Sequence, residues 1–158
     1  MKILIINHYA GSPAMGMEFR PYYFAKEWIK AGHEVTILAA ENSHLRTEQI
    51  KASSKFDFRK IEDITYIFVK TPAYKGNGAK RVINMFTFVI RCLLNARFLS
   101  NVIKPDIVIS SSTYPLDNYL SHSFAKKAKA KHIYEVHDLW PLSPMELGNH
   151  SKYNPFMM

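Results

Sequence analysis

The sequence predicts an α/β fold, a Rossmann-like parallel sheet with helices on both faces. Strand-length apolar runs alternate along the chain with segments in which apolar residues recur at helical spacing, a pattern typical of βαβ units. The 158 residues suit one domain, residues 1–158, which can bury about two-thirds of the surface of the unfolded chain. No internal repeat or low-complexity tract interrupts the alternation.

The first unit covers residues 2–40 and organises the rest. Apolar residues 3–6 form a run of strand length, and helical spacing begins at Phe24. Pro21 suits the first turn of this helix, and Gly32 can adopt the left-handed conformation that ends one. A second buried strand is expected at Glu34–Ala39. Because parallel strands need a right-handed crossover, their carboxyl ends open onto one edge, where a ligand should bind.

The loop from Asn7 to Glu18 lies at that edge. Exposed backbone N–H groups at the start of a helix suit a phosphate or another anion. The spacing of Gly11 and Gly16 matches neither the dinucleotide fingerprint nor the P-loop, because Met17 follows Gly16. A loop that only turns a strand into a helix therefore remains the alternative.

The middle of the chain is expected to complete the sheet. Glu41–Lys55 is polar and aperiodic, which indicates a surface connection with room for a short helix. Phe56, Phe58 and Ile61 precede the strand Ile64–Val69, and the two runs suggest a hairpin or strand pair.

Residues 79–104 predict one long helix, ended by Pro105. Its apolar residues cover most of the circumference, but Arg91 and Arg97 break the run that a membrane-spanning helix needs. From Ile64 to Pro105 the sequence holds seven Lys or Arg residues and no acid. The helix is therefore expected either to lie on an anionic membrane surface or to pack within the fold. If both hold, the two contacts use opposite faces of the helix.

Polar side chains follow two later strands at the same edge. The strand Asp106–Ser110 runs into a hydroxyl cluster that includes Ser112 and Thr113, which can contact a ligand or cap the amphipathic helix that begins near Leu116. The strand His132–Val136 is followed by two titratable residues, His137 and Asp138. The histidine can donate to a ligand hydroxyl and the carboxylate can accept from one. Alternatively, the two satisfy each other or nearby backbone.

Composition narrows the class of function. The net charge is +8, which favours anionic ligands or surfaces without choosing among them. Nucleic-acid binding is not expected, because the basic residues accompany aliphatic rather than stacking side chains. Cys92 is the single cysteine, which fits a reducing cytoplasm, and residues 1–20 lack the pattern of a secretory signal. No spacing predicts a metal site.

Three stretches together resemble a known family: residues 2–40, the segment KPDIVISSSTYP and the segment YEVHDLWPLSPMELG. They are similar to the N-terminal, acceptor-side half of family-4 glycosyltransferases. The likeness is strongest to bacterial N-acetylfucosaminyl-type enzymes that build O-antigen, the polysaccharide of lipopolysaccharide, or capsule. EVHDLWP, placed after the two other motifs, is the most specific part.

The resemblance implies one half of a two-domain GT-B enzyme that needs no metal or other cofactor. Such an enzyme moves a sugar from a nucleotide-diphosphate donor to a lipid-linked acceptor with retention at the anomeric carbon. It implies that Gly16 lies near the donor diphosphate and that His137 contacts the donor sugar, with Asp138 beside it as the second catalytic residue. Glu18 and Arg20, next to the first motif, are expected to bind substrate, as are Ser112 and Thr113.

The resemblance also implies a second domain, C-terminal to this one, that holds most of the nucleotide. Its motifs are missing from these 158 residues, so this chain alone is expected to be inactive until that domain is supplied in cis or in trans. The expected location is the cytoplasm, peripheral on the inner face of the plasma membrane through residues 79–104. The alternative is a non-catalytic membrane-binding subunit that recruits a separate donor-binding partner.

Overall fold

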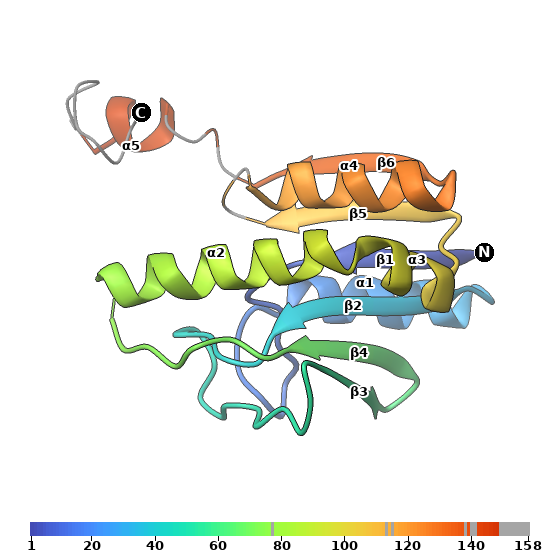
Figure 1. Ribbon diagram of the computed structural model, residues 1–158, viewed down its shortest axis with the longest axis horizontal. Helices are drawn as coiled ribbons and strands as arrows, with labels where there is room; N and C mark the ends of the chain where they lie inside the picture. The colour runs from blue at the N-terminus through green and yellow to red at the C-terminus, as the bar shows by residue number, and fades with distance from the viewer. Residues whose placement is uncertain (77, 113, 115, 138, 140–141, 149–158) are drawn as a thin grey trace.

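The computed structural model describes residues 1–76, 78–112, 114, 116–137, 139 and 142–148, with only the backbone described at Ser112 and Pro144. Strands and helices alternate as the sequence predicts (Figure 1). The strands are β1 (Lys2–Ile6), β2 (Glu34–Ala40), β3 (Phe56–Ile61), β4 (Ile64–Val69), β5 (Ile107–Ser112) and β6 (Lys131–Val136). The helices are α1 (Arg20–Lys30), α2 (Ala79–Leu94), α3 (Ala96–Ile103), α4 (Leu116–Ala128) and α5 (Leu142–Glu146).

The six strands form one sheet in the order β3-β4-β2-β1-β5-β6. All neighbours pair in parallel except β3 and β4, which form the expected hairpin, so the sheet carries one antiparallel edge strand. The order turns at β1, whose neighbours β2 and β5 lie on opposite sides of it. In doubly wound sheets a ligand binds at such a reversal, beyond the carboxyl ends of the strands.

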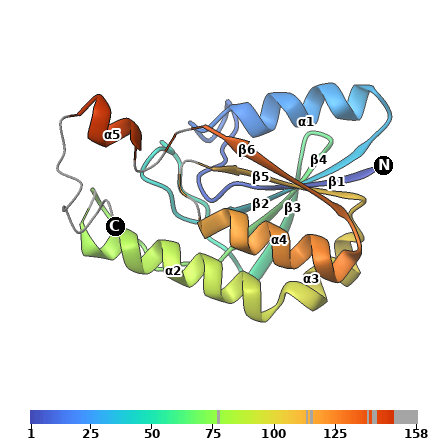
Figure 2. The same ribbon diagram turned by 90° about the horizontal axis from the view of Figure 1, so that it is seen from above.

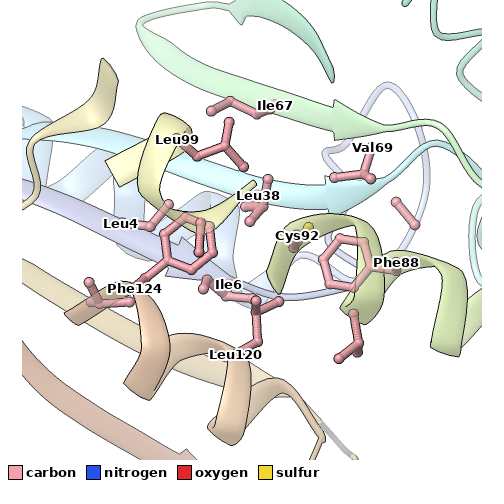
Figure 3. Packing of buried hydrophobic residues seen from close by; sticks show 14 of the residues in the cluster. Leu4, Ile6, Leu38, Ile67, Val69, Phe88, Cys92, Leu99, Leu120 and Phe124 are labelled. Carbon is pink, nitrogen blue, oxygen red and sulfur yellow. The ribbon is translucent and has the colours of Figure 1, made fainter. Parts of the chain in front are cut away.

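Helices cover both faces of the sheet, which confirms the predicted fold class: α1 lies on one face, and α2, α3 and α4 lie on the other (Figure 2). Alternate strand residues serve the two faces, since side chains point to opposite sides with a period of two. Leu4 and Ile6 pack with Phe88 of α2 and Phe124 of α4 (Figure 3), whereas Ile5 belongs to the cluster around α1.

The predicted helix over residues 79–104 is wrong in one respect: it is two helices, whose axes differ by 68°. Asn95 lies at the break. Its side-chain amide donates to the carbonyl oxygen of Arg91 at 2.8 Å, and its backbone N–H bonds to Cys92 rather than to the residue four positions back. An asparagine that occupies a carbonyl in this way competes with the helical hydrogen bonds, so the axis bends here.

The segment 41–55 contains no helix, and it is not wholly a surface connection. Arg46 is buried, and its guanidinium donates to the carbonyl oxygens of Ala10, Ala40 and Glu41. It also lies over the ring of Phe68, 5.4 Å from the centroid. This one side chain therefore joins the loop after β1 to the end of β2.

Candidate functional site

Four polar side chains meet at the carboxyl ends of β5 and β6, and we call them the rim cluster: Arg20, Ser111, Glu135 and His137. Arg20, at the start of α1, donates from Nε to Oε1 of Glu135 at 2.8 Å. Ser111 donates from Oγ to Oε2 of the same carboxylate at 2.6 Å. His137 Nε2 lies 3.1 Å from Ser111 Oγ and 3.2 Å from Glu135 Oε2. The cluster joins three elements that are far apart in the sequence.

The hydrogen bonds of the rim cluster define its charge and one proton position. Partial burial by itself raises the pKa of Glu135, but hydrogen bonds from Arg20, Ser111 and His137 outweigh it, so the pKa lies below its ordinary value and the group is a carboxylate at neutral pH. Because the Ser111 proton already goes to Glu135, Nε2 of His137 must be the donor in its contacts. Nδ1 has no partner among the described residues, which do not include Asp138.

A second network lies beneath the edge and is centred on His8, which follows β1 and is fully buried. Its Nδ1 lies 2.6 Å from the hydroxyl of Tyr114, and its Nε2 lies 2.6 Å from Oδ1 of Asn84. The ring is stacked between those of Tyr9 and Phe88, at centroid distances of 4.6 and 4.9 Å.

The protonation of His8 follows from its partners. Asn84 donates from its amide nitrogen to Thr71 Oγ1 and the Pro72 carbonyl, so its oxygen faces His8 and must accept a proton from Nε2. Nδ1 then accepts from the Tyr114 hydroxyl. Burial lowers the pKa of His8 to about 3, so the ring is neutral at any physiological pH. Since it is also closed to solvent, His8 orders the edge and does not act on a substrate.

Gly16 has a structural role of its own. Its φ is 96°, and a Cβ built on it would lie 2.7 Å from the backbone nitrogen of Thr47. Several backbone amides of this loop are already bonded within it: Gly11 donates to the Glu18 carbonyl, Met15 and Gly16 donate to Ser12, and Glu18 donates to Tyr9. The loop is therefore clamped on the β2–β3 connection, and a diphosphate contact by Gly16 remains a prediction.

The structure describes some of the other predicted site residues fully, one by its backbone only, and two not at all. Arg20 and His137 belong to the rim cluster, where Glu135 bridges them. Ser112 is the last residue of β5 and pairs in register with Val136, the residue before His137. The side chain of Ser112, and Thr113 and Asp138 as a whole, lie outside the described structure. Glu18 is partly exposed, with its backbone bonded inside the first loop.

Sequence reasoning missed Glu135 and the His8 network. The signal for Glu135 was a lone acid within an apolar strand that ends at the predicted edge. The signal for His8 was Asn7-His8 directly after the first buried strand, the same pattern that drew attention to His137. Among the described residues, no group of three or more His, Cys, Asp or Glu side chains could hold a metal ion.

Comparison with known protein families finds one that matches most of this chain. The family model described as Glycosyltransferase Family 4 matches residues 15–158, which include the rim cluster and the last four residues of the first loop. The chain belongs to glycosyltransferase family 4. Sugar transfer is therefore the general activity of the family in which the rim cluster is found.

Solved structures support the fold of this family-4 domain and nothing further. Two crystal structures of the C-terminal domain of a hydrogenase from Pyrococcus furiosus are similar, each with a TM-score of 0.53. Their sequence identities are 18% and 19%, over 84% and 85% of this chain and 89% of each matched chain. No curated protein matches the sequence.

Proposed function

We propose that this family-4 domain is the acceptor-side half of a retaining glycosyltransferase. The enzyme would move a sugar from a nucleotide-diphosphate donor to a lipid-linked acceptor in surface polysaccharide synthesis of the O-antigen or capsule type. The observation that carries the proposal is the rim cluster, because it holds an imidazole in one orientation at the sheet edge where this fold binds ligands.

The transfer reaction requires few catalytic groups from this half of the enzyme. In the transfer step the bond between the anomeric carbon and the diphosphate breaks, and the diphosphate keeps the electron pair. An acceptor oxygen bonds to the same carbon and gives its proton to a phosphate oxygen. Such a cation-like transition state is stabilised by preorganised donors near the leaving group and the sugar. With its proton on Nε2, the neutral His137 ring can accept a hydrogen bond from a sugar hydroxyl through Nδ1 and so hold the donor sugar in place. Glu135 and Ser111 are positioning residues, and Asp138 is kept as the second catalytic residue that the sequence predicts.

The outer face of α2 and α3 supports an acceptor carried by a membrane. One side of each helix packs on the sheet, while the other exposes large apolar side chains between basic ones. We propose that this face rests on an anionic lipid surface, where each Lys or Arg contributes about 1 kcal/mol. In the described part of the chain no single helix could span a membrane, although the bent pair α2–α3 meets the length and composition criteria together. The exposed apolar residues are Val82, Ile83, Phe86, Ile90, Leu93, Leu94, Phe98 and Val102.

A transfer assay tests the proposal. Residues 1–158 alone are expected not to turn over a nucleotide sugar, whereas the same residues with a family-4 donor-binding domain, in one chain or two, should transfer sugar to a lipid-linked acceptor. In the active form His137→Ala should lower turnover about 100-fold with little change in melting temperature. His33→Ala, a histidine at the opposite edge, is the matched control.

Each outcome has a definite meaning. Turnover by residues 1–158 alone would overturn the need for a second domain. Unchanged turnover in His137→Ala would remove the rim cluster from catalysis and favour the non-catalytic, membrane-binding subunit. For the membrane contact, vesicle sedimentation should show binding to anionic but not to neutral vesicles, and equal binding to both would remove it.

A further inference from the structure

We infer that the carboxyl edge holds a second binding site, for the phosphate or diphosphate head of a lipid, in the cavity between the β2–β3 and β4–α2 connections. The inference rests on the proposed function for its lipid-linked acceptor. The cavity has a volume of about 700 Å³. Ser43 and His44 line it from one connection, Tyr74 and Lys75 from the other, and Lys80 from the first turn of α2. None of these residues belongs to the rim cluster.

Two lysine side chains line the cavity. Lys75 and Lys80 are exposed, and neither forms an ion pair or hydrogen bond with any residue that the structure describes. The nearby acid Glu41 is buried, and its two oxygens accept the backbone N–H groups of Thr71 and Ala52 rather than pairing with a lysine. Lysine ammonium groups bind phosphate as point charges, and two beside one cavity suit a dianionic head.

The walls of the cavity are tied together before any ligand binds. The Tyr74 hydroxyl accepts the backbone N–H of His44 at 3.1 Å and lies 2.9 Å from Nδ1 of the same residue, which joins the two connections. Gln49 holds Ser43 by a pair of hydrogen bonds, one accepted from its N–H and one donated to its carbonyl. A site with fixed walls loses less conformational entropy on binding.

A second, largely apolar groove follows Lys80 along α2. It has a volume of about 370 Å³ and lies along α2, lined by Val82, Ile83, Phe86 and Ile90 among others. Lys80 and Ile83 are three residues apart and so are neighbours on the helix surface. Both views show the N-terminal half of α2 projecting past the carboxyl ends of the strands (Figures 1 and 2), so the sheet does not cover it.

The juxtaposition of cavity and groove identifies the ligand class. A head with two negative charges fits beside Lys75 and Lys80, and the apolar chain attached to it lies along α2, where burial of each methylene group is favourable. A soluble nucleotide sugar has the diphosphate but no apolar chain for the groove. The combination therefore favours a lipid phosphate or diphosphate over the donor.

Binding measurements on the 158-residue protein test this assignment by calorimetry, with farnesyl diphosphate, inorganic pyrophosphate and UDP-glucose as probes. We expect farnesyl diphosphate to bind more tightly than pyrophosphate and UDP-glucose not to displace it. Lys75→Ala with Lys80→Ala should weaken farnesyl diphosphate binding at least about tenfold. Lys126→Ala with Lys127→Ala, the same charge change on exposed residues at the end of α4, should leave it unchanged.

A second variant separates the groove from the cavity. Ile83→Ser with Phe86→Ser should weaken farnesyl diphosphate binding about tenfold or more while pyrophosphate binding stays the same. Both side chains are about half exposed, at 55% and 49%, so the substitutions should not unfold the protein, and circular dichroism verifies this. Equal loss for both probes would contradict the groove.

The inference and the proposed function can fail separately. The cavity assignment is overturned if the Lys75/Lys80 and Lys126/Lys127 double variants bind farnesyl diphosphate with equal affinity. It is also overturned if UDP-glucose displaces farnesyl diphosphate at similar concentration. Both conclusions hold even if the His137 variant loses transfer. Lysine-dependent binding together with unchanged transfer in His137→Ala supports the cavity while the proposed function fails. No binding of farnesyl diphosphate at all overturns the inference.

Discussion

Alanine in place of Gly16 tests whether the first loop is clamped on the β2–β3 connection. The residue has φ = 96°, a conformation that L side chains rarely adopt. An added Cβ would lie 2.7 Å from Thr47 N and 3.2 Å from Arg46 Cα, both of them backbone atoms that cannot swing aside. Gly32 is the matched control, since its φ is 83° but a Cβ there would meet nothing within 4 Å.

Both substitutions strain the backbone, but only Gly16→Ala also brings a Cβ into overlap with neighbouring atoms. Left-handed backbone costs an alanine about 1–2 kcal/mol at either position. The overlap at Gly16 adds about 1–3 kcal/mol, as overpacking does elsewhere. The free energy of unfolding should therefore fall by about 2–5 kcal/mol in Gly16→Ala and by about 1–2 kcal/mol in Gly32→Ala. At this chain length each kcal/mol lowers the melting temperature by about 3 °C.

Thermal and urea unfolding of the two purified variants measures the difference. Equal destabilisation would refute the close approach of Gly16 to Thr47. A Gly16→Ala protein as stable as Gly32→Ala but unable to bind a nucleotide-sugar donor, once a donor-binding domain is present, would instead favour the diphosphate contact that the sequence suggests.

Two further predictions concern charged side chains. Glu135→Gln should lower the free energy of unfolding by about 1–2 kcal/mol at neutral pH, a modest value because Arg20 is half exposed. The pKa of Glu135 in the fold is below the ordinary 4.5, so this loss should be complete above about pH 4.5 and vanish as the pH falls through the folded-state pKa, as urea unfolding at several pH values would show. A pH-independent loss would contradict it. Arg46→Met should lower the free energy of unfolding by about 3–5 kcal/mol, because it leaves buried carbonyls without their donor. Arg97→Met, on the surface of α3, is the control and should leave the free energy of unfolding almost unchanged. Equal unfolding curves for the two variants would refute the role of Arg46.

The sheet was predictable because each of its signals is local. Strand-length apolar runs and the Gly32 turn lie within a few residues of the elements they define, and the structure reproduces them within one or two residues. The break at Asn95 was not predictable in the same way. An asparagine inside an apolar helical pattern is tolerated in many helices, and here the bend depends on which carbonyl its side chain reaches.

The sequence predicts which residues lie at the edge of the candidate site, but not which of their side chains touch. Topology predicts which strand ends share an edge, so His137 could be placed there from its position after β6. Which side chains touch depends on long-range packing: Arg20 and Glu135 are 115 positions apart, and Arg46 reaches Ala10 across 36. A polar segment such as 41–55 gives no sign that one of its arginines is buried, since burial is decided by the carbonyls around it.

The positions of the two proposed sites constrain the acceptor. The rim cluster lies at the β5–β6 end of the edge and the cavity at the β2–β4 end, and four strand spacings separate β4 from β6. At about 4.8 Å for each spacing, β4 and β6 are about 19 Å apart. A lipid diphosphate bound in the cavity reaches His137 only if an extended sugar chain lies between its phosphate and the reacting hydroxyl. Transfer in the presence of a donor-binding domain should therefore be faster with lipid-linked oligosaccharides than with a lipid-linked monosaccharide. Equal rates with both acceptors would show that the cavity and the rim cluster do not hold the two ends of one molecule.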